Sequence, residues 1–256
     1  MTNDLKKINP IDTITRVLKG ERCDKVKRKL EEWSDSAFDS FLRDNYNKIR
    51  KELKKVAQCS DDDFDDRFFE IFVAKKLTKI LSPSRFRLFY QPFEKQRGPD
   101  LKCILYNDNE LEFYIEAKHI RESAIGKRSW DSNAPIPYLL DNSVKIQNDI
   151  KYKKPQFHQS SVNLLVIGTE DVTFDPYNLP GALRGEVDER TGVAISGFSE
   201  MELNRFSAVL LKSFGEWTLW INKRAETEIP NQLVEILADA EARKELKILK
   251  IGLTQL

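Results

Sequence analysis

The sequence predicts an α/β fold with a mixed central β-sheet flanked by helices and an N-terminal helical appendage. Three observations support this prediction. Apolar residues recur at helical intervals from about residue 11 to residue 58, short β-like runs follow, and helical patterns return among and after these runs. Interleaved helices and strands are typical of this class. We therefore divide the chain into an appendage, residues 1–58, and a main domain, residues 59–256.

Each element of the main domain has its own local signal. Ser60 and the acidic residues after it are a helix start, since they satisfy and complement the first amides, and Pro83 is a stop. Turn residues separate the strands. We expect helices at 62–81, 143–154 and 229–248, strands at 86–91, 101–106, 111–118 and 162–168, a hairpin of 206–214 with 217–222, and long loops at 121–142 and 171–196.

The composition excludes several classes of protein. Lys and Arg (42) nearly cancel Asp and Glu (41), so the net charge of +1 supplies no overall field that would attract a polyanion. Three cysteines without a CxxC pair argue against a disulfide framework and a zinc ribbon, and are typical of a reducing cytoplasm. No apolar run approaches the ~20 residues that span a bilayer, so we expect a cytoplasmic protein without a membrane partner.

Two short segments carry residues suited to phosphodiester hydrolysis. That reaction requires a cation that neutralises developing charge and lowers the pKa of a bound water. Magnesium prefers oxygen ligands, accepts one or two carboxylates and keeps several waters. Gly98-Pro99-Asp100 supplies one acid, and Ile115-Glu116-Ala117-Lys118 supplies a second acid and an ammonium group.

The strand pattern predicts that these groups meet. Residues two apart in a strand share a face, so Glu116 and Lys118 point the same way. Matching the apolar faces pairs Leu105 with Phe113, Cys103 with Ile115 and Leu101 with Ala117, around a turn at 108–110. This register sets Asp100 opposite Lys118 and Lys102 opposite Glu116. The competing interpretation is an exposed cross-strand charge pair, with Asp100 as a turn cap.

The hairpin resembles the core of the PD-(D/E)xK nuclease superfamily, whose fold is restriction-endonuclease-like. The resemblance covers about residues 60–170, and its literal matches are Pro99-Asp100, Glu116-Ala117-Lys118 and an upstream helical acid, best assigned to Glu70. It implies that Asp100 and Glu116 ligate Mg²⁺, that the Ala117 carbonyl adds a ligand, and that Lys118 orients or activates the attacking water. It also implies a DNA substrate, with Mn²⁺ able to substitute for Mg²⁺.

Glu70 and the helix after the hairpin supply supporting candidates. Glu70 lies on or beside the apolar face of its helix, where a carboxylate needs a cation; the alternative to a metal-supporting role is a salt bridge to Arg67. Superfamily members often carry Lys or Gln on the helix after the ExK strand, which points to Gln147 first and Lys151 second. A solvated helix face explains these two residues equally well.

Other basic segments have two interpretations each. Lys127, Arg128 and Trp130 in the long loop could stack on a base and grip phosphate, or Trp130 could anchor the loop to its own core. The basic clusters of the appendage, 25–29 and 48–55, are either solvated helix faces or a phosphate-contacting surface. A homodimer formed through these helices is a third hypothesis.

The sequence therefore predicts a cytoplasmic, Mg²⁺-dependent DNA nuclease with Asp100, Glu116, Lys118 and Glu70 at the reaction centre. The alternative is a catalytically inactive module of the same fold that binds nucleic acid or a protein partner.

Overall fold

The computed structural model describes residues 9–82, 84–93, 98–106, 110–120, 146–148, 150–151, 157, 160–168, 181–183, 185–187, 194–196, 204–213 and 216–249. The helices are α1 (Pro10–Thr15), α2 (Gly20–Glu32), α3 (Ser36–Val56), α4 (Asp61–Leu81) and α9 (Asn231–Ala242). The strands are β1 (Phe86–Tyr90), β2 (Leu101–Tyr106), β3 (Glu110–His119), β4 (Val162–Gly168), β5 (Gly185–Val187), β6 (Ala194–Ser196), β7 (Ala208–Ser213), β8 (Glu216–Ile221) and β9 (Lys247–Leu249). None of the helices in these ranges is long and apolar enough to cross a membrane.

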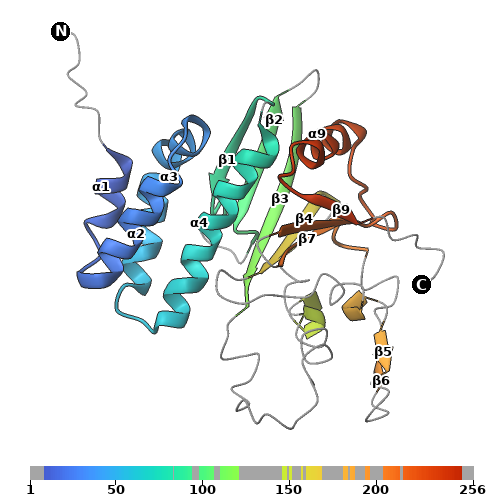
Figure 1. Ribbon diagram of the computed structural model, residues 1–256, viewed down its shortest axis with the longest axis horizontal. Coiled ribbons are helices and arrows are strands. Elements are labelled where there is room, and N and C mark those ends of the chain that lie inside the picture. The colour runs from blue at the N-terminus through green and yellow to red at the C-terminus, as the bar shows by residue number, and fades with distance from the viewer. Residues whose placement is uncertain are drawn as a thin grey trace.

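A mixed seven-stranded sheet forms the centre of the molecule (Figure 1), in the order β1-β2-β3-β4-β7-β8-β9. The first three strands are antiparallel neighbours, whereas β3, β4 and β7 run parallel. β8 is antiparallel to β7 and parallel to β9. The predicted α/β class with a mixed sheet and flanking helices, including an N-terminal helical region, is confirmed.

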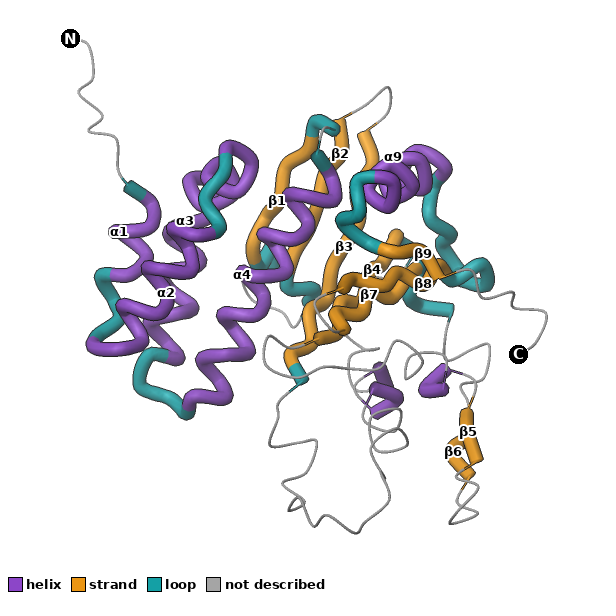
Figure 2. The backbone as a smooth tube through the Cα atoms, viewed as in Figure 1, coloured by secondary structure: helices purple, strands orange, loops and turns teal. Residues whose placement is uncertain are grey.

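Helix α4 is the element that joins the N-terminal helices to the sheet. Ser60 caps it by accepting a hydrogen bond from the Asp63 amide, and Asp61, Asp62 and Asp63 complement the positive end of its dipole. It is buried on several sides, because it packs against α3 and also against β3. Figure 2 shows the N-terminal helices, in purple, grouped on one side of the orange strands.

Two apolar clusters lie on opposite faces of the sheet. The larger includes the alternate residues Phe113, Ile115 and Ala117 of β3 together with apolar residues of α1–α4 and α9. The smaller contains Ile146 and Ile150 with apolar residues of β4, β7 and β8. A sheet covered on both faces buries its central strands completely, which explains the near-continuous apolar sequence of β4.

The register of the first hairpin differs from the predicted one. Leu101 pairs with Ile115, Cys103 with Phe113 and Leu105 with Leu111, a shift of two residues along β3. β3 begins at Glu110, so the connection is formed by residues 107–109 and not by 108–110. A shift of two residues leaves every side chain on its predicted face, and matching of apolar faces therefore could not distinguish the two registers.

The C-terminal part of the chain also differs from prediction. The closing helix ends at Ala242, and Lys247–Leu249 forms β9 at the edge of the sheet. Lys244, between them, has a left-handed φ of 59°, which ends the helix. In the second predicted loop, the described residues include the antiparallel pair β5 and β6. The loop at 121–142 lies outside the described residues.

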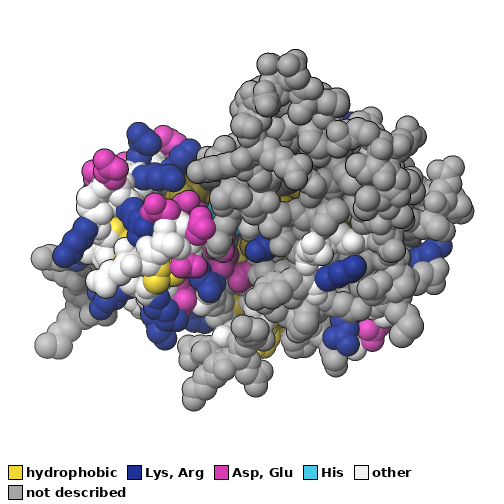
Figure 3. Space-filling view, turned by 90° about the horizontal axis from the view of Figure 1, so that it is seen from below, with side chains coloured by type: hydrophobic (Ala, Val, Ile, Leu, Met, Phe, Trp, Pro, Cys, Tyr) yellow, Lys and Arg dark blue, Asp and Glu magenta, His cyan; other side chains and the backbone are white. Residues whose placement is uncertain are grey.

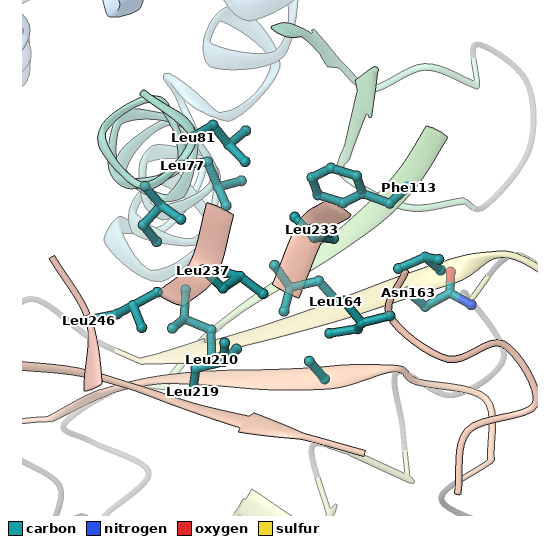
Figure 4. A pocket seen from close by; sticks show the side chains of 14 residues that line it. Leu77, Leu81, Phe113, Asn163, Leu164, Leu210, Leu219, Leu233, Leu237 and Leu246 are labelled. Carbon is teal, nitrogen blue, oxygen red and sulfur yellow. The ribbon is translucent and has the colours of Figure 1, made fainter. Parts of the chain in front are cut away.

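A small cavity lies in the larger cluster, between α4, α9 and the sheet (Figure 4). Its volume is about 20 Å³, which suffices for about one water molecule. Leu77, Phe113, Leu237 and other apolar side chains line it, with Asn163 at one side. Because its walls are almost entirely apolar and it is so small, it is a packing defect and not a substrate site.

Candidate active site

Strand β3 separates an apolar face from a charged one. Phe113, Ile115 and Ala117 enter the cluster under α4, so Glu116 and Lys118 project to the opposite face. Glu116 is fully buried, with 0% of its surface exposed, and Lys118 is half-buried. Burying a carboxylate is costly without a compensating cation or hydrogen bonds. The sequence places this acid where an apolar residue would be less costly to bury.

Asp100 is held directly against the strand that carries Glu116. It is 8% exposed, and its Oδ2 atom accepts a hydrogen bond of 2.9 Å from the backbone amide of Ala117. The observed ladder, extended by one residue beyond Leu101, sets Asp100 level with Glu116. The predicted pairing of Asp100 with Lys118 is therefore wrong, and so is that of Lys102 with Glu116, since Lys102 lies opposite Tyr114 and pairs with Glu112.

Glu70 of α4 is joined to Asp100 through an arginine. Arg67 Nη1 lies 2.6 Å from Glu70 Oε1 and 4.0 Å from Asp100 Oδ1. Tyr90, the last residue of β1, donates a hydrogen bond of 2.6 Å to Glu70 Oε2. The salt bridge that the sequence left as the alternative for Glu70 is thus present, and the same arginine also faces the acid of the hairpin.

The charges in this group hold its members in defined protonation states. Burial alone lowers the pKa of Arg67, but the carboxylates of Glu70 and Asp100 raise it above its ordinary value, so the guanidinium stays charged. Burial, and then the charge of Glu70, raise the pKa of Tyr90 well above its usual range. Tyr90 therefore remains a hydrogen-bond donor to Glu70 at neutral pH.

A strained residue ties the same site to α3. Gln91 follows β1 with a left-handed φ of 41°, a conformation that costs a residue with a side chain about 1 kcal/mol or more. Its amide donates to the Asp100 carbonyl at 2.7 Å, and its own carbonyl accepts from Lys48 Nζ at 3.1 Å. Asp100 is therefore held at two atoms: β3 binds its side chain, and Gln91, itself bound by α3, binds its backbone carbonyl.

The chemistry of the donors fits a hard divalent cation. Glu70, Asp100 and Glu116 are all carboxylates and all buried, and Mg²⁺ needs only one or two of them with waters. Within the described ranges, however, no group of three or more His, Cys, Asp or Glu side chains is arranged to hold a metal ion. Asp100 and Glu116 are thus the pair that would hold Mg²⁺, while Glu70 is engaged by Arg67 and Tyr90.

Of the supporting residues, Gln147 is buried and Lys151 is exposed. Gln147 donates from Nε2 to the Ala182 carbonyl at 3.3 Å, which joins two segments on the Glu116 side of the sheet. Lys151 ends the described part of this helical segment. Lys127, Arg128 and Trp130 lie outside the described residues.

Some contributors were not visible in the sequence. His119, next to Lys118, was not among the predicted site residues: its ring centroid lies 5.2 Å from that of Phe69, and its Nδ1 lies 3.2 Å from Asp66 Oδ1. Tyr90 was missed, because nothing in a strand sequence marks a tyrosine whose hydroxyl reaches a helix. Arg67 was noticed only as a partner of Glu70, since its proximity to Asp100 depends on how α4 crosses the sheet.

No protein-family model matches this chain, and neither a curated protein nor a solved structure matches it. Inference about function therefore depends on the chain's own residues.

Proposed function

We propose that this protein is a Mg²⁺-dependent nuclease that hydrolyses phosphodiester bonds of DNA. The observation that carries the proposal is the contact of Asp100 with the Ala117 amide, because it brings one buried acid against the strand that carries the second, Glu116. Two buried acids next to each other are costly, because each carboxylate loses its hydration. Their retention is expected where a cation and a phosphate bind between them.

Each side chain has a defined role in this proposal. Asp100 and Glu116 would hold the metal, and the Ala117 carbonyl would be a further oxygen donor. When bound, Mg²⁺ supplies charge neutralisation at the phosphate and lowers the pKa of a coordinated water. Lys118, on the Glu116 face, orients the attacking water and stabilises the negative charge that develops on the phosphate. Arg67 and Tyr90 hold Glu70 in place, and Glu70 in turn positions Arg67 beside Asp100.

The test compares two lysines on the same face of the hairpin. Purified protein is incubated with circular, linear and branched DNA and Mg²⁺ or Mn²⁺, in parallel with Lys118→Ala and Lys102→Ala. Lys102 is a matched control because it pairs with Glu112, away from the acids. We expect metal-dependent cleavage that Lys118→Ala abolishes and Lys102→Ala retains. Absence of cleavage with every substrate, or equal activity of both variants, would contradict the proposal.

Metal binding provides a second, independent measurement. Calorimetry with Mg²⁺ or Mn²⁺ should detect binding to the wild type that Asp100→Ala loses. If neither protein binds metal, the inactive binding module becomes the better interpretation. The engagement of both Glu70 oxygens by Arg67 and Tyr90 is the feature that favours that module.

The proposed location is the cytoplasm. All three cysteines, Cys23, Cys59 and Cys103, are free thiols, and the last is buried in the core. A reducing compartment suits such a chain.

A further inference from the structure

The two basic clusters of the N-terminal helices differ in how their charges are compensated. On α2, all four cations of the first cluster face acids: Lys25 lies 3.8 Å from Asp65, Lys27 lies 3.0 Å from Asp12, and Arg28 and Lys29 both lie within 3.9 Å of Glu32. In Figure 3, blue and magenta side chains are accordingly interspersed over the described helical part. Each cation of this cluster therefore already has an acidic partner within the protein.

The part of α3 from Arg43 to Lys55 has the opposite character. Its exposed positions Arg43, Arg50, Lys51 and Lys54 form no ion pair with any residue in the described ranges. The two acids of this segment are already engaged, since Asp44 pairs with Arg87 at 3.0 Å and Glu52 is buried against Lys55. An uncompensated row of four cations therefore remains on one helix face, and we call it the α3 basic row.

The positions of these residues suit an extended polyanion. Steps of 100° per residue place Arg43, Arg50, Lys51 and Lys54 within one third of the helix circumference, opposite the buried Asn45 and Ile49. From Arg43 to Lys54 the row spans about 17 Å at 1.5 Å per residue, or roughly five base-pair steps of 3.4 Å. A single phosphate or an acidic side chain would engage only one end of it.

The α3 basic row is rigidly connected to the candidate active site. Asn45 donates to the Leu88 carbonyl at 3.0 Å and accepts from the Tyr90 amide at 2.9 Å, so α3 is fixed on β1 by a buried side chain. One turn later, Lys48 Nζ donates a hydrogen bond to the Gln91 carbonyl, and the Gln91 amide donates one to the Asp100 carbonyl. Only two hydrogen bonds separate α3 from the proposed metal ligand.

We infer that the α3 basic row is a contact surface for the phosphate backbone of duplex DNA, on the face of α3 that points away from β1. The inference rests on the proposed function, and it names the part of the protein that binds the duplex outside the cleavage site. It also explains how a chain with a net charge of +1 binds a polyanion, since the positive charge is concentrated locally and the nearby acids, Asp44 and Glu52, are paired within the fold.

Salt-dependent binding of a fluorescent duplex DNA of about 30 base pairs tests this surface, with EDTA present so that cleavage plays no part. The variant combines Arg50→Gln, Lys51→Gln and Lys54→Gln. The matched control combines Lys25→Gln, Lys27→Gln and Arg28→Gln, which removes the same charge from α2. We expect the α3 variant to bind about tenfold more weakly or worse, with the slope of log K against log salt reduced by about 2 to 3. The α2 variant should bind as the wild type does.

Unchanged binding by the α3 variant, or equal losses in both variants, would overturn the inference. So would a wild type that fails to bind the duplex, or that binds only anionic phospholipid vesicles through these residues. Failure of the proposed function is distinguishable: binding that depends on the α3 basic row without metal-dependent cleavage would uphold the surface and reject the nuclease. Far-ultraviolet circular dichroism confirms that both triple variants are folded.

Discussion

The two halves of α4 are both buried against the sheet, but they bury different chemistry. The N-terminal half carries Arg67 and Glu70, which form a charged network with Tyr90 and Asp100. The C-terminal half carries Leu77, Ile80 and Leu81, which line a small apolar cavity. One helix thus covers a polar end and an apolar end of the same sheet.

The comparison indicates what each half contributes. Apolar burial stabilises a fold at about 25 cal/mol per Å², whereas buried ion pairs roughly cancel their own desolvation cost. The apolar side chains of α4 therefore account for its stability, and in the N-terminal half these include the buried Phe64 and Phe68. The charged network of Arg67 and Glu70 adds little to stability by itself, so a role in binding or chemistry explains its presence.

The largest effect is expected from the acids at the polar end. Asp100→Asn and Glu116→Gln should each reduce metal-dependent cleavage by about a thousandfold, or roughly 4 kcal/mol, because a neutral amide holds Mg²⁺ poorly. Thermal unfolding should show stability equal to or above the wild type, since a buried charge is removed. Cleavage within tenfold of the wild type would show that these acids do not hold the catalytic metal.

The apolar end should give the reverse result. Leu77 lines the cavity and is only 2% exposed. Leu77→Ala therefore enlarges the cavity and should lower the free energy of unfolding by about 2 to 5 kcal/mol. Denaturant titration measures this change. Cleavage per folded molecule should stay at the wild-type level, and a specific loss of activity at equal folded fraction would break the division between the two halves.

Removing the arginine should have an intermediate effect. Arg67→Met leaves Glu70 and Asp100 without their nearest cation and should cost about 1 to 3 kcal/mol of stability. If the acids bind metal, saturating Mg²⁺ should raise the melting temperature of this variant more than that of the wild type, because the ion replaces the lost charge. An equal response of the two proteins would argue against a cation beside Asp100.

The smallest effects are expected at two residues with a left-handed backbone conformation, Gln91 after β1 and Lys244 after α9. Lys244→Gly and Gln91→Gly should each change stability by about 1 kcal/mol or less, because relief of the strained φ is partly offset by the greater freedom of glycine in the unfolded chain. Only Gln91→Gly should reduce cleavage, since Gln91 positions Asp100. Equal activity of both variants would show that Asp100 does not need this support.

The local features of the fold were predictable from the sequence. The bounds of β2 and β4 matched the expected ranges, and α4 began one residue earlier than expected, because turn residues, Ser60 and Pro83 act over a few residues. The faces of β2 and β3 were also correct, since alternation is a local property. The hairpin register was wrong, because a shift by two residues preserves that alternation.

The arrangement of the candidate site was only partly predictable. Asp100 and Glu116 were expected to approach each other on neighbouring strands, and the Asp100 contact with Ala117 agrees with that expectation. The exact partner of Asp100 was not predictable, and neither was the link through Arg67, because both depend on the register and on how α4 crosses the sheet.

The sequence by itself determined which residues form helices and strands and which side chains share a face, because these depend on periods of 3.6 and 2 and on nearby caps. Tertiary structure alone decided which charges compensate one another. Lys25 and Lys51 look alike in sequence and both are exposed, yet Lys25 lies 3.8 Å from Asp65 of α4, whereas Lys51 has no ion pair among the described residues. Such pairing is set by the packing of elements far apart in the chain, where distances of a few ångströms decide the electrostatic energy.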